Sequence, residues 1–547
     1  MPGMHRNLAA MAAMKFDLLI IGGGITGASI AWDASLRGLS VALIDKHDFA
    51  CATTAASSKL IHGGLRYLRN FQIGLVRESL RERRIWETIA PHMVMPLRFV
   101  LPSADWRAHL TLRAGLLLYD VLSFDRNRLQ DPDKWLPGHR ALSREAAIAE
   151  EPILGGASRS GALSYYDCQM HTPERLALEF IQGAVQHGAH VANYAQAVRL
   201  NSTNGVVAGA RVRDQLGGGE YDIPAEITIN AAGPWADHVA ADGGASGQVK
   251  LMRSKGIHVI TRPLSKHAIA VIGADGHFFV LPWRGYSLIA TTDTPYTNDP
   301  DELRVTGEDI TELLDKVNRG LPAANLVRSD VRYAYAGLRP LVADPADPRN
   351  DTYGASRGSE IFDHAKADGR AGLISAIGGK WTTSRHLAEQ VVDMALGKLG
   401  RAGQPSVTAH TPLIGGDIPR FNRFVEEACA RHTALPREVV THLALAYGTR
   451  LDAIIALVAE EPAMGERLSP HLPEIAAQIR YAVRSELALT LEDAVFRRTG
   501  LCTLGHPGYP ALVTAGRIMA QELGWSESER KRQIATVEQR FAVSEFR

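Results

Sequence analysis

Cysteine is scarce in this chain, with four residues among 547: Cys51, Cys168, Cys429 and Cys502. No two of them have a CxxC spacing, which argues against structural zinc and iron–sulfur sites, and we expect no metal. So few cysteines also fit a reduced, intracellular setting better than a scaffold held by disulfides.

An excess of charge of one sign is also missing, since 60 Lys and Arg residues face 59 Asp and Glu residues, for a net charge of +1. No overall field favours nucleic acid or a strongly acidic partner, and we expect no nucleic-acid partner. No uncharged apolar run reaches the ~18 residues that a membrane-spanning helix needs. The nearest candidate, 110–122, contains Arg113 and Asp120, so we expect no transmembrane helix.

The chain is long and has the composition of an ordinary globular protein. Hydrophobic residues make up 46% and charged residues 22%, and 547 residues exceed one core, so two or three domains are expected. We interpret residues 1–14 as a loose extension and not as a cleaved signal peptide, because the apolar run continues directly into a glycine motif.

The segment FDLLIIGGGITGASIAWDASLRGLSVALID, residues 16–45, reads as a βαβ unit. Residues 16–21 predict a buried parallel strand, 25–37 a helix that stops at Gly38, and 40–44 a second strand. A unit of this kind places a glycine loop at a helix N-terminus, where anions bind.

Three glycines in the unit, Gly22, Gly24 and Gly27, have the G-x-G-x-x-G spacing. Gly22 permits a tight turn, Gly24 lets the backbone approach a pyrophosphate, and Gly27 allows close helix–strand packing. Asp45 lies 18 residues after the last glycine and is placed to accept hydrogen bonds from ribose hydroxyls. The unit predicts dinucleotide binding, against the alternative of a merely structural turn.

A block of small residues, ACATTAASSKLIHGGLRYL at 50–68, favours FAD over NAD. Small side chains let a bulky flat ligand lie against the backbone, and a nicotinamide enzyme has no reason to carry this block directly after the second strand. The candidate cofactor contacts here are Ser57, Ser58, His62, Gly63 and Gly64.

At this block the chain resembles the FAD-dependent glycerol-3-phosphate dehydrogenases of the respiratory, aerobic type. SSKLIHGGLRYL is similar to that family's signature. Further blocks match in order: NAAGPWAD (230–237), RSKGIHVI (253–260), ATTDTPY (290–296), AGLRPL (336–341), IGGKWTTSR (377–385), AYGTR (446–450) and YAVRSELALTLEDAVFRRT (481–499). Asp45 in place of the common Glu and Ala290 in place of a frequent Gly are mild departures.

The expected fold class is α/β with three parts. A Rossmann-like FAD-binding domain of the glutathione-reductase and D-amino-acid-oxidase type would combine 15–85, 160–240 and 355–398. An antiparallel β-sheet domain that caps the flavin and binds substrate would use 86–159 and 241–354. After a Gly/Pro-rich linker, 399–547 would form an all-α domain.

The resemblance implies oxidation of sn-glycerol 3-phosphate to dihydroxyacetone phosphate, with a hydride passing from C2 to flavin N5 and electrons going on to a quinone. A phosphomonoester needs arginine or lysine, because guanidinium matches its oxygens bidentately. The substrate-binding candidates are Arg66, Tyr67, Arg339, Arg357 and Lys380. The alternative for each cation is a surface ion pair, and Tyr67 could simply pack.

The proton-accepting group stays open between two histidines. Histidine suits proton abstraction near neutral pH, and a nearby Lys380 would keep it uncharged. His62 lies in the small-residue block and His258 begins the strand HVIT. The third alternative is another group, including Arg339 acting electrostatically, so the catalytic candidates are His62, His258, Arg339 and Lys380.

Two later segments are expected to complete the flavin pocket. In this fold type the strand and turn that reach Val198 commonly contact the adenine side through their backbone. Gly378 and Gly379 mark a place where the backbone approaches the isoalloxazine or the substrate, unless they only turn the chain.

Reoxidation by a quinone implies contact with a membrane without spanning it. Residues 66–84 carry six arginines (66, 69, 77, 81, 83 and 84) with interleaved apolar residues, and the apolar segment 110–122 lies next to Trp106. They predict a basic amphipathic surface for anionic lipid, on the inner face of the cytoplasmic membrane in a cytoplasmic protein. The alternative is that the arginines pair with acids elsewhere. A homodimer is left open.

Three rival functions remain at this point. A glycerol-3-phosphate oxidase would pass electrons to oxygen and use the same residues. An FAD amine or amino-acid oxidase would need a carboxylate site in place of a phosphate site. A flavin-binding redox sensor would hold FAD that glycerol 3-phosphate cannot reduce.

Overall fold

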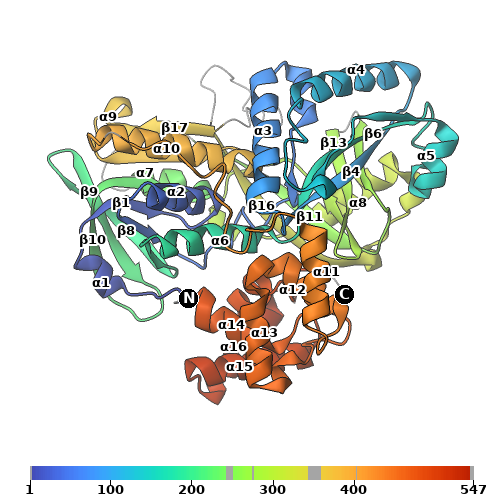
Figure 1. Ribbon diagram of the computed structural model, residues 1–547. Helices are drawn as coiled ribbons and strands as arrows, with labels where there is room; N and C mark the ends of the chain where they lie inside the picture. Colours follow the sequence, from blue (N-terminus) through green and yellow to red (C-terminus); the bar gives the residue numbers. More distant parts are fainter. Residues whose placement is uncertain (1–2, 242–250, 274–275, 343–358, 402, 542–547) are drawn as a thin grey trace.

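The computed structural model describes residues 3–241, 251–273, 276–342, 359–401 and 403–541. Within them the chain forms two β-sheets that lie side by side, with a helical domain packed against one side of both (Figure 1). The predicted fold class, an α/β nucleotide-binding part, a largely antiparallel sheet and an all-helical C-terminal part, is confirmed.

The first sheet has a parallel centre, in the order β18-β10-β1-β2-β7, with β17 antiparallel at its edge. β8 and β9 extend it from the first half of β10 as an antiparallel meander. The strands are β1 (Phe16–Ile21), β2 (Val41–Ile44), β7 (His190–Ala192), β8 (Ala195–Thr203), β9 (Val206–Asp214), β10 (Glu220–Asn230), β17 (Ser359–Asp363) and β18 (Leu373–Gly378).

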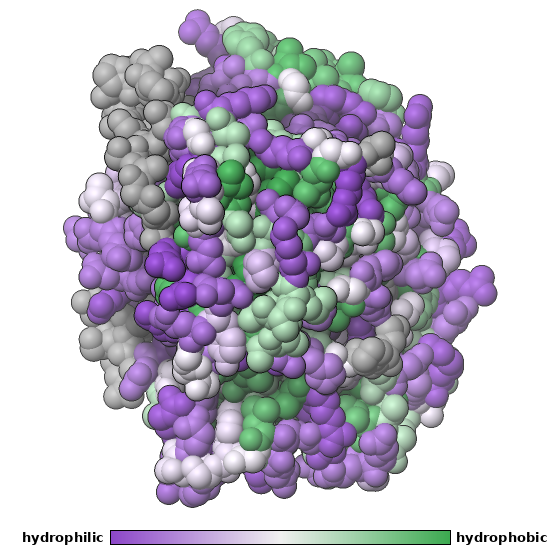
Figure 2. All heavy atoms as spheres, turned by 90° about the vertical axis from the view of Figure 1, so that its left-hand side faces the viewer, coloured by the Kyte–Doolittle hydropathy of each residue, from purple (hydrophilic) through white to green (hydrophobic). Residues whose placement is uncertain are grey.

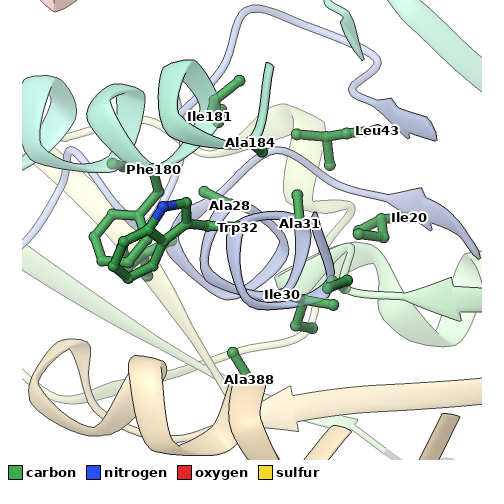
Figure 3. Packing of buried hydrophobic residues seen from close by; sticks show 14 of the residues in the cluster. Ile20, Ala28, Ile30, Ala31, Trp32, Leu43, Phe180, Ile181, Ala184 and Ala388 are labelled. Carbon is green, nitrogen blue, oxygen red and sulfur yellow. The ribbon is translucent and has the colours of Figure 1, made fainter. Parts of the chain in front are cut away.

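The helix of the βαβ unit, α2 (Ile25–Leu36), is buried on all sides, because it packs on the sheet between α6 (Pro173–Gln186) and α10 (Ser384–Lys398) (Figure 3). Trp32 of α2 meets the Phe180 ring of α6 edge-on, with ring centroids 5.0 Å apart. This packing fixes the helix N-terminus against the edge of the sheet where the glycines lie.

The second sheet is antiparallel except where β12 runs parallel to β4. Its order is β15-β11-β14-β13-β12-β4-β6-β3, with β16 on β11 and β5 on β6. The strands are β3 (Leu60–Ile61), β4 (Val94–Pro102), β5 (Arg140–Leu142), β6 (Ala162–Met170), β11 (Leu251–Thr261), β12 (Ala268–Gly273), β13 (Gly276–Trp283), β14 (Tyr286–Ala290), β15 (Thr294–Tyr296) and β16 (Val331–Val342). The helix α8 (Gly307–Gly320) packs on one face.

The domain boundaries expected from the sequence need a correction at β3 and β6. Both fall in segments assigned to the nucleotide-binding domain, but both lie in the second sheet. The reason is pairing: β6 forms an antiparallel ladder with β4 over its whole length, and β3 pairs with β6.

The expected loose extension at 1–14 is also wrong. Residues 8–12 form the short helix α1 (Leu8–Ala12), whose Leu8 and Met11 are buried against the first sheet. Arg6 donates hydrogen bonds to both carboxylate oxygens of Asp214, at 3.0 and 2.6 Å. Apolar burial and an ion pair therefore fasten this segment to the nucleotide-binding part.

The arginine-rich stretch does not form the continuous basic surface that we expected. It runs through η1 (Leu65–Asn70) and α3 (Ile73–Ile89), where Arg83 is fully buried and paired with Asp167 at 2.5 Å. Arg77 and Arg84 both pair with Asp125, as the alternative interpretation anticipated.

The helical domain consists of α11 (Phe421–Arg431), α12 (Arg437–Tyr447), α13 (Leu451–Glu460), α14 (Ala476–Glu486), α15 (Tyr509–Leu523) and α16 (Glu527–Gln539). Among the described residues, the helical stretch 437–460 is long and apolar enough to cross a membrane by length and composition alone. It breaks at Gly448, between α12 and α13, and Leu443, Leu451 and Ile454 pack in the core of the domain. We therefore interpret it as two core helices.

The molecular face on the side of the first sheet is largely hydrophilic, with apolar groups scattered between polar ones (Figure 2). This is the surface expected where charged side chains cover helices whose other faces are buried.

Candidate active site

Two adjoining cavities run between the sheets, with volumes of about 560 and about 760 Å³. Thr53, Pro340, Gly379, Lys380 and Trp381 line both, so the cavities form one continuous cleft. The first cavity extends over the glycine loop at the edge of the first sheet, and the second reaches into the second sheet.

Gly22 and Gly27 of the loop have the steric roles that the sequence predicts. Gly22 has φ +111°, and a Cβ there would lie 2.5 Å from the Ala231 carbonyl oxygen. A Cβ on Gly27 would lie 1.8 Å from the Gly22 oxygen, so that residue serves helix–strand packing and not ligand contact. Gly22 and Gly24 line the first cavity, and Gly24 caps the N-terminus of α2. The loop therefore offers an open backbone and a helix N-terminus to an anion.

Asp45 and Val198 line the same cavity. The Asp45 carboxylate accepts hydrogen bonds from the amides of Gly23 and His47, and burial raises the pKa of Asp45 to about 6. The register of β8 on β9 shifts between Ala197 and Arg199, which leaves Val198 at an irregularity of the ladder. Its backbone is thus available to a flat ligand.

These features fit FAD. An elongated cleft offers open backbone and a helix N-terminus to a pyrophosphate, a carboxylate to a ribose and an interrupted strand to an adenine. Gly378 and Gly379, with φ +73° and +88°, line the first cavity, and Gly379 also lines the second, so both lie beside the junction of the two cavities.

The second cavity brings together cations from distant parts of the chain. Its lining includes the predicted residues Ser57, Ser58, His62, Gly64, Arg66, Tyr67, His258, Arg339 and Lys380. Gly63 faces away from both cavities and packs on Tyr119, whose hydroxyl a Cβ would approach to 2.3 Å. Arg357 lies outside the described residues.

Arg339 is held by a hydrogen-bond chain on the second sheet. Its guanidinium donates to Thr291 Oγ1 at 2.6 Å and to Ser254 Oγ at 3.1 Å, and the Ser254 hydroxyl donates to Asp293 at 2.6 Å. Gly256 makes room for it, because a Cβ there would lie 2.2 Å from Arg339 Nη2. The guanidinium is therefore fixed before any ligand binds.

Lys380 and Arg66 line the same cavity and are held by other neighbours. Lys380 Nζ donates to Ser79 Oγ at 2.9 Å and lies 3.9 Å from the centre of the Tyr67 ring. Burial lowers the pKa of Lys380 to about 7. Arg66 Nη1 lies 3.0 Å from Nε2 of His277, so the imidazole accepts from the guanidinium.

Both candidate histidines are uncharged at neutral pH. Burial, with Lys380 and Arg66 nearby, lowers the pKa of His62 to about 3. Burial and Arg339 hold the pKa of His258 well below its usual range. His258 Nε2 lies 3.1 Å from Ser58 Oγ, and its ring stacks on Tyr335. A neutral imidazole can accept a proton, so the geometry admits either histidine as the base.

Sequence reasoning missed further polar residues of this cavity, among them Thr291, Asp293, His277 and Lys316. The block ATTDTPY signalled the first two. His277 and Lys316 carry no local motif, and only the pairing of β12 with β13 and the packing of α8 bring them to the site. Among the described residues, no group of three or more His, Cys, Asp or Glu side chains is arranged to hold a metal ion.

Comparisons with known proteins agree with this site. Residues 17–385 match the family described as FAD dependent oxidoreductase, and 406–530 match the C-terminal domain of alpha-glycerophosphate oxidase. A glycerol-3-phosphate dehydrogenase of Synechocystis sp. is 37% identical, over 97% of both chains. An aerobic glycerol-3-phosphate dehydrogenase of Staphylococcus aureus is 33% identical, over 89% of this chain and 87% of its own.

A solved structure is similar over almost the whole chain. The glycerol-3-phosphate dehydrogenase of Bacillus halodurans, complexed with FAD, has a TM-score of 0.78 and 30% identity, with 98% of this chain and 96% of the other covered. The chain has an FAD-type cleft with a cationic cavity beside it, and it is similar to glycerol-3-phosphate dehydrogenases over almost its whole length. It therefore belongs to the FAD-dependent glycerol-3-phosphate dehydrogenase family.

Proposed function

We propose that this protein oxidises sn-glycerol 3-phosphate to dihydroxyacetone phosphate and passes the electrons to a quinone at a membrane surface. The observation that supports the reaction is the convergence of Arg66, Arg339 and Lys380 on one cavity next to the FAD cleft. Three cations suit a phosphate dianion, whereas an amino-acid substrate carries one carboxylate and needs fewer.

Different residues of the chain would bind the phosphate and accept the proton. Arg339, fixed by Thr291 and Ser254, and Lys380, next to Tyr67, would bind the phosphate and orient the C2 hydroxyl. His62 or His258, both neutral, would take the hydroxyl proton. Bound FAD would supply the redox chemistry by accepting the C2 hydride at N5.

The test is the flavin spectrum of the purified holoprotein without oxygen. Glycerol 3-phosphate should bleach the yellow absorbance, while glycerol, which lacks the phosphate, should not. A flavin that stays oxidised with glycerol 3-phosphate contradicts the proposal and supports a redox sensor. Bleaching by an amino acid instead would support the amino-acid oxidase.

An exposed row of large apolar side chains supports the membrane part. The helix α4 (Trp106–Leu122) and the segment just after it expose Trp106 at 63%, Val121 at 68% and Phe124 at 67% of their surfaces. We name the apolar stripe the set Trp106, Leu110, Leu117, Val121 and Phe124, which recurs at helical spacing. Exposed apolar stripes of this kind are typical of membrane-surface helices.

The apolar stripe connects to the substrate cavity through η1. Arg66, Tyr67 and Arg69 of η1 line the cavity, and Phe71 directly after it is 85% exposed. η1 and α4 pack in the same apolar cluster, which includes Leu68 and Leu116. A lipid-dissolved acceptor at the stripe would therefore lie on the side of the cavity that η1 closes.

The acceptor is tested by following electrons during turnover. With quinone-containing vesicles, substrate oxidation should reduce quinone, and aerated protein without quinone should produce little hydrogen peroxide. Stoichiometric hydrogen peroxide without quinone would overturn the quinone part in favour of an oxidase, and would leave the oxidation of glycerol 3-phosphate standing.

A further inference from the structure

We propose that the helical domain holds the adenine end of the FAD site in its binding geometry, with Asp48 and Tyr194 as positioning residues. The inference depends on the FAD cleft and not on the identity of the substrate. It assigns a role to a C-terminal domain whose described residues line neither cavity.

Two loops form the adenine end, and they are joined to each other. The first follows β2 and contains Asp45 and His47; the second follows β7, contains Asn193 and Tyr194, and leads into Ala195, the first residue of β8. The Ala195 amide donates to the Asp45 carbonyl at 2.7 Å, and the Tyr194 amide donates to the His47 carbonyl at 2.9 Å. Asp45, His47 and Ala195 line the first cavity, so a shift of either loop changes the cofactor site.

Asp48 ties the first loop to the helical domain. Its fully buried carboxylate accepts from Arg497 Nε at 2.5 Å and from Arg498 at 2.7 and 2.8 Å. The Asn193 side chain of the second loop adds a hydrogen bond at 2.9 Å. Asp45 thus faces the cavity, while Asp48 on the same loop faces two arginines of another domain.

Tyr194 links the second loop to the same segment of the helical domain. Its hydroxyl donates to Asp493 at 2.6 Å, and its φ of +53° is a conformation that a tyrosine rarely adopts without support. Asp493, Arg497 and Arg498 all belong to η11 (Asp493–Arg498), a π-helical turn. Both loops therefore converge on one turn of the helical domain.

The burial of Asp48 makes the position of the first loop depend on the helical domain. A buried carboxylate without partners is strongly unfavourable, and the two arginines that pair with Asp48, Arg497 and Arg498, both belong to the helical domain. Although burial raises it, Arg498 and Arg497 hold the pKa of Asp48 well below its usual range. The loop can bury Asp48, and so present Asp45, only when η11 is docked.

The test measures FAD affinity of the holoprotein in the absence of substrate, from the flavin fluorescence released on serial dilution. Tyr194→Phe removes the contacts of its hydroxyl with Asp493 and Thr490 and should raise the FAD Kd about three- to tenfold. Asp48→Asn should raise it at least about tenfold, with the flavin absorbance of the bound fraction unchanged. Tyr194→Phe leaves no charge unpaired, so the FAD Kd of this variant is sufficient to test the proposal if Asp48→Asn does not fold.

The matched control is Glu474→Gln, the same chemical change at another interface of the helical domain. Glu474 is also fully buried and paired with an arginine, Arg284 in the turn between β13 and β14, but lines neither cavity. It should lower the Tm and keep the FAD Kd within about twofold of wild type. An unchanged FAD Kd in Tyr194→Phe, or a rise in Glu474→Gln as large as that in Asp48→Asn, would overturn the proposal.

Discussion

The ammonium group of Lys380 lies 3.9 Å from the centre of the Tyr67 ring. The two residues come from η1 and from the turn after β18, so tertiary folding alone brings them together. The aromatic face stabilises the lysine cation, while burial lowers its pKa to about 7. Because Lys380 lines the proposed substrate cavity with a pKa near neutrality, the pH dependence of the reaction directly tests its role.

The first prediction concerns Lys380. Its cationic fraction falls as the pH rises through about 7, so kcat/KM for glycerol 3-phosphate should decline above that pH. Lys380→Arg keeps the charge and should abolish the decline up to about pH 9, because guanidinium does not deprotonate there. A wild-type pH profile in the variant would remove Lys380 from the phosphate site.

The second prediction concerns Arg339. Arg339→Ala removes a charge-assisted contact worth about 1.5–3 kcal/mol, so KM should rise roughly ten- to a hundredfold. Steady-state kinetics with a fixed electron acceptor measures this. An unchanged KM would place the phosphate elsewhere in the cavity.

The third prediction uses a glycine as a probe of the same guanidinium. A Cβ at position 256 would lie 2.2 Å from Arg339 Nη2, so Gly256→Ala must displace Arg339 without removing its charge. KM should rise at least about tenfold from this misplacement. The atoms that must move are those of the Arg339 guanidinium at the end of a long side chain, so the Tm should fall only by what its hydrogen bonds to Thr291 and Ser254 contribute. A normal KM would show that the site tolerates a displaced guanidinium.

The fourth prediction separates the histidines. Removing the general base should lower kcat by about a hundred- to ten-thousandfold. His62→Gln and His258→Gln, compared by anaerobic single-turnover reduction of the flavin, should therefore differ sharply, with the larger loss at the base. Equal and small losses would exclude both and favour Arg339 acting electrostatically.

The fifth prediction concerns the apolar stripe. Leu117→Glu with Val121→Glu should weaken binding to anionic lipid vesicles about a hundredfold or more, since each side chain contributes about 1.5–3 kcal/mol on burial. The control is Leu216→Glu, at a similarly exposed leucine between β9 and β10 of the first sheet. Sedimentation with vesicles measures both, and equal loss in the control would assign binding to net charge.

Sequence patterns sufficed wherever the chemistry is local. The βαβ unit, its three glycines and Asp45 lie within one short segment, so their geometry follows from turn and helix physics, and the structure places them as predicted. The arginines of 66–84 show the limit: their spacing suggested one basic surface, yet Arg83 is buried against Asp167 and Arg66 lines the second cavity. Residue spacing on a helix does not reveal which acid lies opposite on another element.

The sequence by itself determined the cofactor class and the identity of the cations, because glycine spacing and residue chemistry need no partner. Only the tertiary structure decided that Arg66, Arg339 and Lys380 share one cavity, that His277 and Lys316 join them, and that Asp48 pairs with the helical domain. The physical reason is that charge pairing and cavity lining depend on contacts between residues hundreds of positions apart, which strand pairing and domain docking alone create.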